Sequence, residues 1–180
     1  GRKMSKSLGN TVTPEEVMKQ YGADILRLWA LSENSQQDLR ISRTIVAHLV
    51  VVYRTLRNTL RFLLGNLGDY DPASGPEKPV FEVDAWALER LKKLVDDVTA
   101  FNAEYAFHKG VQEIFSFCNI ELSSFYLDCL KDRLYTRGKD SPERRSAQKA
   151  MHEILLGLLV LLAPVLSFTC EEAYGYLPSK

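Results

Sequence analysis

The sequence has 180 residues, enough for one good-sized domain or one domain with a small appendage. With 46% hydrophobic and 26% charged residues it has the composition of an ordinary soluble globular protein. The 23 Lys and Arg residues balance the 23 Asp and Glu residues, which excludes a basic field over the whole molecule, so any nucleic acid must bind through a local patch.

The first 43 residues predict a loop followed by small elements. Residues 1–13 are rich in Lys, Ser, Gly, Asn and Thr and indicate a loop. Thr13 followed by Pro14 predicts the N-cap and first residue of a short helix ending near Tyr21. A second helix is expected over 23–32. The alternating polar and apolar residues of 37–42 predict one short strand.

The remaining residues have helical periodicity. Apolar residues recur three and four positions apart from residue 43 onward, and Gly and Pro residues separate the segments. Asp84 is expected to cap the second long helix. We expect helices over residues 43–65, 84–107, 108–135 and 142–163, with a short final helix over 167–177. The predicted fold is all-α: an antiparallel helical bundle (44–180) with a small N-terminal loop, helix and strand appendage (1–43).

The composition also argues against a membrane or metal-binding protein. The most apolar stretch, Ile154 to Leu166, contains Gly157 and Pro164 and is shorter than the roughly 20 residues that span a bilayer. No signal peptide is visible at the polar start, and we expect the chain to be a piece of a longer protein. Three scattered cysteines are expected to be buried and reduced, without the spacing of a zinc site. They are Cys118, Cys129 and Cys170.

The loop over residues 3–7, hereafter the signature loop, carries the clearest chemistry. Lys3 and Lys6 supply two ammonium groups, and Ser5 and Ser7 supply two hydroxyls. Such a loop suits a polyphosphate, because a lysine is a compact charge that can follow the charge developing on phosphate oxygens. It lacks the glycine spacing of a P-loop. A solvated linker is the alternative interpretation.

The signature loop reads KMSKS, and this pentapeptide resembles the one typical of class I aminoacyl-tRNA synthetases. Further stretches resemble the subgroup for isoleucine, valine, leucine and methionine, and those from residue 57 onward are most similar to the isoleucyl type; a valyl-type fragment is the alternative. The stretches are LGNTV (8–12), YGADILRLW (21–29), RNTLRFLLGNL (57–67), FYLD (125–128), KDRLYT (131–136) and LSFT (166–169).

This resemblance implies a role in the ATP-dependent activation of isoleucine, with Mg2+, and its transfer to tRNA(Ile). Lys6 would stabilise the charge on the ATP phosphates, Lys3 would assist, and Ser5 and Ser7 would shape the loop or contact the phosphates. The His-x-Gly-His element and the zinc segment of the family are absent from this chain. We therefore expect the chain alone to be inactive and to bind no cofactor. The resemblance implies a cytoplasmic monomer.

Two groups of basic residues are candidates for contacts with tRNA. Arg54, Arg57, Asn58 and Arg61 are spaced to share one polar stripe of a helix. They could contact RNA phosphates and bases, or brace a neighbouring helix through acidic residues. A second excess of basic residues over 131–149 contains Arg137, Arg144 and Arg145. An ordinary solvated corner is the alternative there.

Most aromatic residues fall at core-like spacing, but Tyr105 and Tyr135 lie near predicted helix ends, where they could stack on unpaired bases. Two other classes of function remain open. One is a stand-alone tRNA-binding helical module, which would have no use for the signature loop. The other is a structural bundle that mediates protein association.

Overall fold

All regular secondary structure among the described residues is helical. The computed structural model describes residues 4–8, 11–34, 36–39, 41–74, 76 and 81–177. The α-helices are α1 Pro14–Tyr21, α2 Ala23–Ser32, α3 Arg43–Gly65, α4 Glu82–Ala103, α5 Phe107–Ser116, α6 Leu127–Tyr135, α7 Pro142–Leu162 and α8 Ser167–Gly175. A π-helix, η3 Phe117–Tyr126, joins α5 to α6, and two short 3-10 helices are η1 Lys6–Leu8 and η2 Pro72–Ser74.

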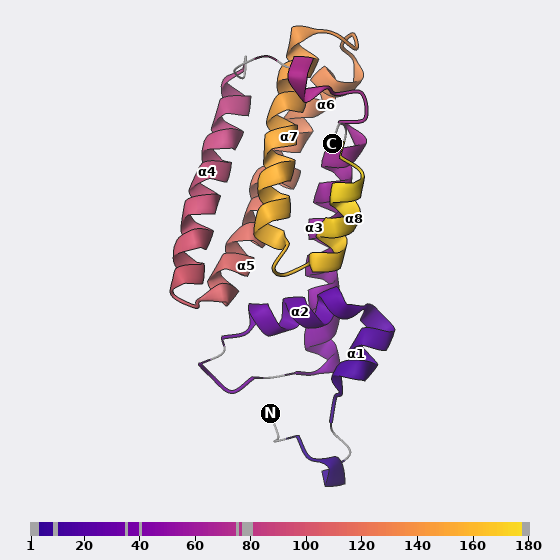
Figure 1. Ribbon diagram of the computed structural model, residues 1–180, viewed down its shortest axis with the longest axis vertical. Helices are drawn as coiled ribbons and strands as arrows, with labels where there is room; N and C mark the ends of the chain where they lie inside the picture. The colour runs from indigo at the N-terminus through magenta and orange to yellow at the C-terminus, as the bar shows by residue number, and fades with distance from the viewer. Residues whose placement is uncertain are drawn as a thin grey trace.

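The long helices run up and down beside one another (Figure 1). Helix α3 rises from the N-terminal part, α4 returns, the continuous α5–η3–α6 segment rises again, α7 returns, and α8 turns back along α3. The short helices α1 and α2 lie at the base of the bundle, next to the start of α3. The expected all-α antiparallel bundle is confirmed.

The core follows from the three- and four-residue spacing of apolar side chains. Leu56, Leu60 and Leu63 of α3 are at most 2% exposed, and Ile154 and Leu158 of α7 are fully buried. Residues so spaced lie on one face of a helix, so each long helix buries one stripe against its neighbours. A second, smaller cluster of Val17, Ile25 and Val46 joins α1 and α2 to the base of α3.

Two helices begin with a side-chain cap, and the one at Thr13 was predicted. The Thr13 hydroxyl accepts a hydrogen bond from the Glu16 N–H at 3.3 Å, and the Glu16 carboxylate accepts one from the Thr13 N–H at 3.4 Å. This capping box fixes the first turn of α1, with Pro14 at its first position. Ser141 likewise accepts from the Arg144 N–H at 3.3 Å, before Pro142 opens α7.

The predicted strand over 37–42 is wrong. Its described residues, 37–39 and 41–42, form no strand. An extended segment becomes a strand only when a neighbouring segment accepts and donates its backbone hydrogen bonds. The described part of the chain offers no second strand, so alternation over six residues does not suffice to form one here.

Asp84 does not cap α4, contrary to the prediction. The N-cap of α4 is Phe81, and Asp84 is fully buried three residues further on. Its carboxylate accepts hydrogen bonds from Arg133 (2.7 and 2.8 Å), the Tyr126 hydroxyl (2.9 Å) and the Ser146 hydroxyl (2.9 Å). These four residues are the Asp84 network. It ties α4 to η3, α6 and α7, because a buried carboxylate needs charged or hydrogen-bonding partners.

The π-helix η3 helps to direct Tyr126 into the Asp84 network. The Ser123 and Ser124 hydroxyls donate to the carbonyls of Cys118 and Asn119, each five residues earlier, at 2.7 and 2.8 Å. The wider turn shifts the faces of the helix relative to an α-helix of the same length. Tyr126, at the end of η3, is thereby fully buried beside Asp84.

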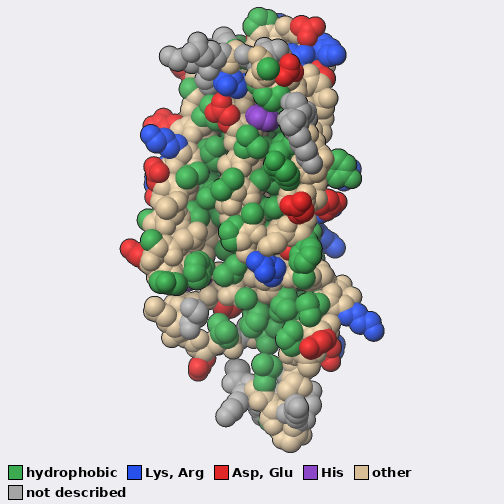
Figure 2. Space-filling view, in the orientation of Figure 1, with side chains coloured by type: hydrophobic (Ala, Val, Ile, Leu, Met, Phe, Trp, Pro, Cys, Tyr) green, Lys and Arg blue, Asp and Glu red, His purple; other side chains and the backbone are tan. Residues whose placement is uncertain are grey.

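One of the three cysteines differs from expectation. Cys118 and Cys170 are buried as expected, but Cys129 is exposed. Figure 2 shows hydrophobic side chains through the middle of one face, with charged groups mostly toward its margins. On α7, Leu156 and Val160 are exposed. None of the described helices is long and apolar enough to cross a membrane.

Candidate nucleic-acid interface

The structure describes only part of the signature loop. Its second half enters the short 3-10 helix η1, and the Ser5 and Ser7 hydroxyls lie 2.7 Å apart in a hydrogen bond. Lys3 and the side chain of Lys6 lie outside the described residues. The two hydroxyls therefore share one short turn, and the roles expected for the lysines stay predictions.

The four polar residues of α3 form one exposed edge, as their spacing predicted. Arg54, Arg57, Asn58 and Arg61 are all exposed, and the successive intervals between them are three, one and three residues. Arg57 makes a two-pronged ion pair with Glu172 of α8, at 2.8 and 3.0 Å. This pair raises the pKa of Arg57, which keeps its charge. Hereafter these four residues are the α3 edge.

The sequence left two roles open for the α3 edge, a brace to a neighbouring helix or a contact with RNA, and its arginines divide between these two situations. Arg57 braces α8 through Glu172, yet it keeps a side-chain exposure of 44%. Arg54 and Arg61 form no ion pair with any residue that the structure describes. A positive group without an internal partner is available to an external anion, so Arg54 and Arg61 are the members best suited to phosphate.

Two adjoining hollows follow the α3 edge. One, of about 410 Å³, lies between α3 and α8 and is lined by Leu60, Leu64 and Ala173 as well as by Arg57 and Arg61. The other, also about 410 Å³, is lined by residues of α3 and its C-cap together with Tyr135 of α6. Arg61 and Gly65 line both. The result is a groove with an apolar wall beside the guanidinium of Arg61, for which the described part of the chain supplies no ion-pair partner.

Tyr135 stands at the far end of this groove. Its side chain is 63% exposed, and it shares the second hollow with Asn58, Arg61 and Asn66. A flat aromatic ring beside amide and guanidinium donors suits an unstacked base. The helix-end position predicted its exposure, but only the fold of the bundle places the end of α6 beside the hollow that Arg61 lines.

Tyr105 is not part of the same surface. It is 75% exposed and follows α4 with a φ of 57°, packing edge-to-face on Phe107 at 6.0 Å. The turn between α4 and α5 lies at the opposite end of the bundle from the end of α6 (Figure 1). The two candidate stacking tyrosines therefore cannot act on one short RNA loop.

Arg144 and Arg145 hold the loop after α3 against α7. Arg144 makes a two-pronged pair with Asp69, at 2.6 and 2.9 Å, and also donates to the Leu134 and Lys139 carbonyls. Arg145 donates to the Asp69 carbonyl at 2.7 Å and to Asp140 at 2.8 Å. Both arginine side chains are about 15% exposed. These contacts fit a brace, and a contact with tRNA stays a prediction.

Arg137 differs from these two. Its side chain is 55% exposed, and its one ion pair among the described residues is a long contact of 4.0 Å with Asp132. Exposed pairs of this kind hold their members weakly. Of the three basic candidates over 131–149, Arg137 is thus the one able to turn toward an external phosphate.

The Asp69 carboxylate makes the stability of the chain dependent on pH. Hydrogen bonding from Arg144, and then from Gln148, holds the pKa of Asp69 well below its ordinary value of 3.8. A depressed pKa stabilises the folded state above the ordinary value, and this contribution is lost as the pH falls through the folded pKa. We expect Asp69→Asn to lower the free energy of unfolding by the same amount from pH 7 to about pH 5, and by progressively less below about pH 4.

Urea unfolding of both proteins at each pH measures this difference. An Asp140→Asn variant is the matched control, because that carboxylate is exposed and shares Arg145 with Asp69. Its effect on the urea midpoint should be smaller at every pH. A gap between Asp69→Asn and the unsubstituted chain that stays constant down to pH 2 would contradict the assignment to Asp69.

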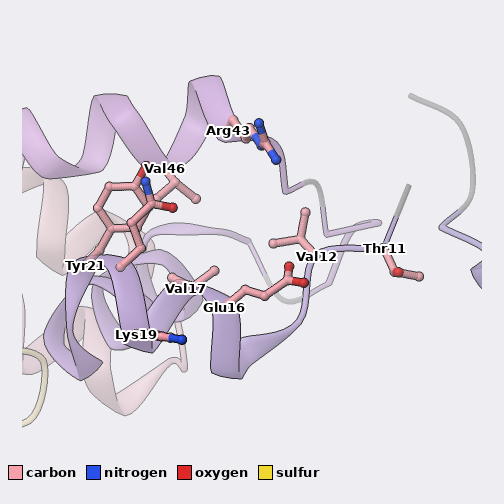
Figure 3. A pocket seen from close by; sticks show the side chains of 9 residues that line it. Thr11, Val12, Glu16, Val17, Lys19, Tyr21, Arg43 and Val46 are labelled. Atoms are coloured by element: carbon pink, nitrogen blue, oxygen red, sulfur yellow. The ribbon is translucent and has the colours of Figure 1, made fainter. Parts of the chain in front are cut away.

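The largest of the described hollows lies at the base of the molecule, below the bundle. It measures about 670 Å³ and is lined by α1, the segment before it and the start of α3 (Figure 3). Val12, Val17 and Val46 form its apolar side, and Glu16, Lys19 and Arg43 bring charge of both signs. Among the described residues, no cluster of His, Cys, Asp or Glu could hold a metal ion. In the sequence, the residues that line this hollow begin at Thr11, shortly after the signature loop.

Comparisons with known families match both parts of the chain. The family model described as anticodon-binding domain of tRNA ligase matches residues 84–180. The model described as tRNA synthetases class I (I, L, M and V) matches residues 1–42. The isoleucine–tRNA ligase of Kosmotoga olearia is 54% identical over 179 residues, covering 99% of this chain and 19% of its own length. That of Thermotoga maritima is 50% identical over 182 residues, covering 100% and 20%.

Solved structures share the fold. Mycobacterium tuberculosis methionyl-tRNA synthetase, in complex with methionyl-adenylate, matches 97% of this chain and 35% of its own with a TM-score of 0.78 at 22% identity. Agrobacterium radiobacter K84 agnB2 LeuRS, in a ternary complex with tRNA and LeuAMS, matches 98% and 21% with a TM-score of 0.65 at 23% identity. The chain spans about a fifth of the length of the curated relatives it matches.

Proposed function

Because the chain belongs to the anticodon-binding domain family of tRNA ligases, we propose that it is the tRNA-binding part of an isoleucine–tRNA ligase. The whole enzyme would activate isoleucine with ATP and transfer it to tRNA(Ile). Residues 1–43 would belong to the end of the catalytic core, and residues 44–180 would form the anticodon-binding bundle. The relatives at about 50% identity support the isoleucyl type over a valyl-type fragment.

Within this proposal the signature loop binds the ATP phosphates. Lys6 would stabilise the charge that develops there, with Lys3 beside it and the Ser5 and Ser7 hydroxyls shaping the turn. In the whole enzyme Mg2+ would accompany the ATP phosphates. The three free cysteines fit the reducing cytoplasm. The same proposal has the enzyme acting as a monomer.

The observation that carries the tRNA-binding role is the groove along the α3 edge. Arg61 is unpaired among the described residues, borders both hollows and lies beside the exposed ring of Tyr135. Arg54 and Arg61 would contact phosphates, Asn58 and Tyr135 would face a base, and Arg57 would contact RNA while holding Glu172. The local positive charge of this edge would be enough to bind RNA phosphates, although the chain as a whole is neutral.

Replacing Arg61 by alanine in the whole enzyme tests the groove. We expect the affinity for tRNA(Ile) to fall roughly tenfold at low salt, equivalent to one charge-assisted hydrogen bond of about 1.5 kcal/mol. The slope of log affinity against log salt should become shallower by about one, because one phosphate contact is lost. Filter binding over a salt series measures both quantities.

Lys92→Ala is the matched control, since Lys92 is an exposed cation of α4, across the bundle from α3. It should leave both the affinity and the salt slope unchanged. Equal losses in the two variants would indicate non-specific attraction. No loss with Arg61→Ala would remove the α3 edge from the proposed interface.

A further inference from the structure

Helix α2 caps a helix that lies far away in the sequence. The Asp24 carboxylate accepts hydrogen bonds from the N–H groups of Phe168 (3.3 Å) and Thr169 (2.8 Å) and from the Thr169 hydroxyl (2.6 Å). These N–H groups belong to the first turn of α8, which has no capping side chain of its own. Asp24 is 7% exposed, so it performs from α2 the function of an N-cap residue.

The same face of α2 holds the turn between α7 and α8. Arg27 donates from Nε to the Val165 carbonyl at 3.2 Å and from its terminal nitrogen to the Pro164 carbonyl at 2.6 Å. Asp24 and Arg27 are three residues apart and so lie on one side of α2. A carboxylate thus meets the start of α8 and a guanidinium meets the carbonyls after α7, the arrangement that helix dipoles favour. Together these contacts are the α2 clamp.

Helix α3 also contacts the first turn of α8, at Thr169. The Tyr53 and Thr169 hydroxyls lie 3.0 Å apart. Because Thr169 gives its one hydroxyl hydrogen to Asp24, the Tyr53 hydroxyl must donate to Thr169. One turn further along α3, Arg57 pairs with Glu172 of α8. A chain of hydrogen bonds therefore runs from α3 through α8 to α2.

The position of the α2 clamp gives it a consequence for catalysis. Helices α1 and α2 directly follow the signature loop, and Tyr53 and Arg57 lie on the helix that carries the α3 edge. Resting on the proposed function, we propose that Asp24 and Arg27 are positioning residues that hold the base of the signature loop in register with the tRNA-binding bundle. They contact neither RNA nor ATP. They set where the bundle places a bound tRNA relative to the loop.

Asp24→Asn in the whole enzyme tests this proposal, because an amide presents its NH2 group to N–H donors and weakens the cap. We expect kcat for charging tRNA(Ile) to fall roughly 3- to 30-fold, the range for residues that couple two sites. The dissociation constant for tRNA should change less than about twofold, since the α3 edge is intact. Isoleucine-dependent ATP–pyrophosphate exchange without tRNA should also change less than about twofold, because that reaction does not require alignment with the bundle.

Three further variants separate positioning from folding. Tyr53→Phe keeps the cap on α8 but removes the link to α3, so it should lower charging by a smaller factor. Arg27→Lys retains the charge and can reach one carbonyl, so it should retain more charging than Arg27→Ala. Asp97→Asn removes a carboxylate from an exposed pair with Lys93 on α4 and should leave charging unchanged.

Specific outcomes would overturn the proposal. Equal losses of charging and pyrophosphate exchange would mean that Asp24 supports the active site or the fold rather than alignment. Loss of tRNA affinity would place Asp24 in the binding surface, and unchanged charging would mean that the clamp has no catalytic consequence. Failure of the proposed function has a different signature: the unsubstituted enzyme would then show no isoleucine-dependent exchange.

Discussion

Replacing Asp84 by alanine is expected to lower the free energy of unfolding of this chain by about 3–5 kcal/mol. The carboxylate is fully buried, and Arg133, whose side chain is 10% exposed, donates to both of its oxygens. Without Asp84 this guanidinium stays buried, and the remaining electrostatic partner that the described residues offer it is the Phe81 ring, 4.5 Å away at its centre. Unfolding in urea, followed by circular dichroism, measures the loss.

The Tyr126 hydroxyl adds to this cost. Burial raises the pKa of Tyr126, and the charge of Asp84 raises it further, so the hydroxyl stays protonated and donates to Asp84. With alanine at position 84 this buried donor loses its acceptor. The expected loss therefore comes from two uncompensated groups rather than from the attraction within the ion pair.

A double variant separates these sources. Asp84→Leu with Arg133→Met replaces the buried pair by apolar side chains and should recover part of the stability lost in Asp84→Ala. Asp97→Ala, which breaks an exposed pair with Lys93, should cost less than about 1 kcal/mol. An Asp84→Ala variant as stable as Asp97→Ala would show that the network contributes little.

Local signals in the sequence predicted most of the fold. The Thr13 and Ser141 caps, the prolines that follow them and the three- and four-residue spacing of leucines each depend on neighbours within one turn. Such features form wherever the segment is placed, which is why the helix order and the all-α fold could be predicted. The strand over 37–42 failed because strand pairing requires a distant partner that the pattern cannot supply.

The same distinction explains the candidate site. Sequence spacing predicted that the α3 edge would share one face, since that depends on α3 alone. It did not predict that Arg57 would pair with Glu172, 115 residues away, or that Arg144 would pair with Asp69. Whether an arginine is free or bound is decided by packing between helices. Asp84 is a further example: it was expected to cap a helix, but it forms a buried ion pair with Arg133, 49 residues away.

Lys6→Ala in the whole enzyme is expected to slow isoleucine-dependent ATP–pyrophosphate exchange by roughly 10²–10³-fold, the effect of losing one group that stabilises charge in a transition state. Under the proposed function the ammonium of Lys6 meets the phosphate oxygens as pyrophosphate leaves. The loss should fall mainly on kcat, with the KM for isoleucine little changed, because the lysine acts on charge that develops during the reaction.

The lysines of the signature loop allow a graded comparison. Lys3→Ala removes the same charge from the edge of the loop and should reduce exchange by a smaller factor. Lys19→Ala, an exposed lysine of α1 that follows the loop, should have no effect on kcat. If all three variants lost activity equally, general attraction of ATP to a positive region would explain the result, and that effect would weaken with salt. A loss confined to Lys6, and retained at high salt, is what a direct contact with the reacting phosphates requires.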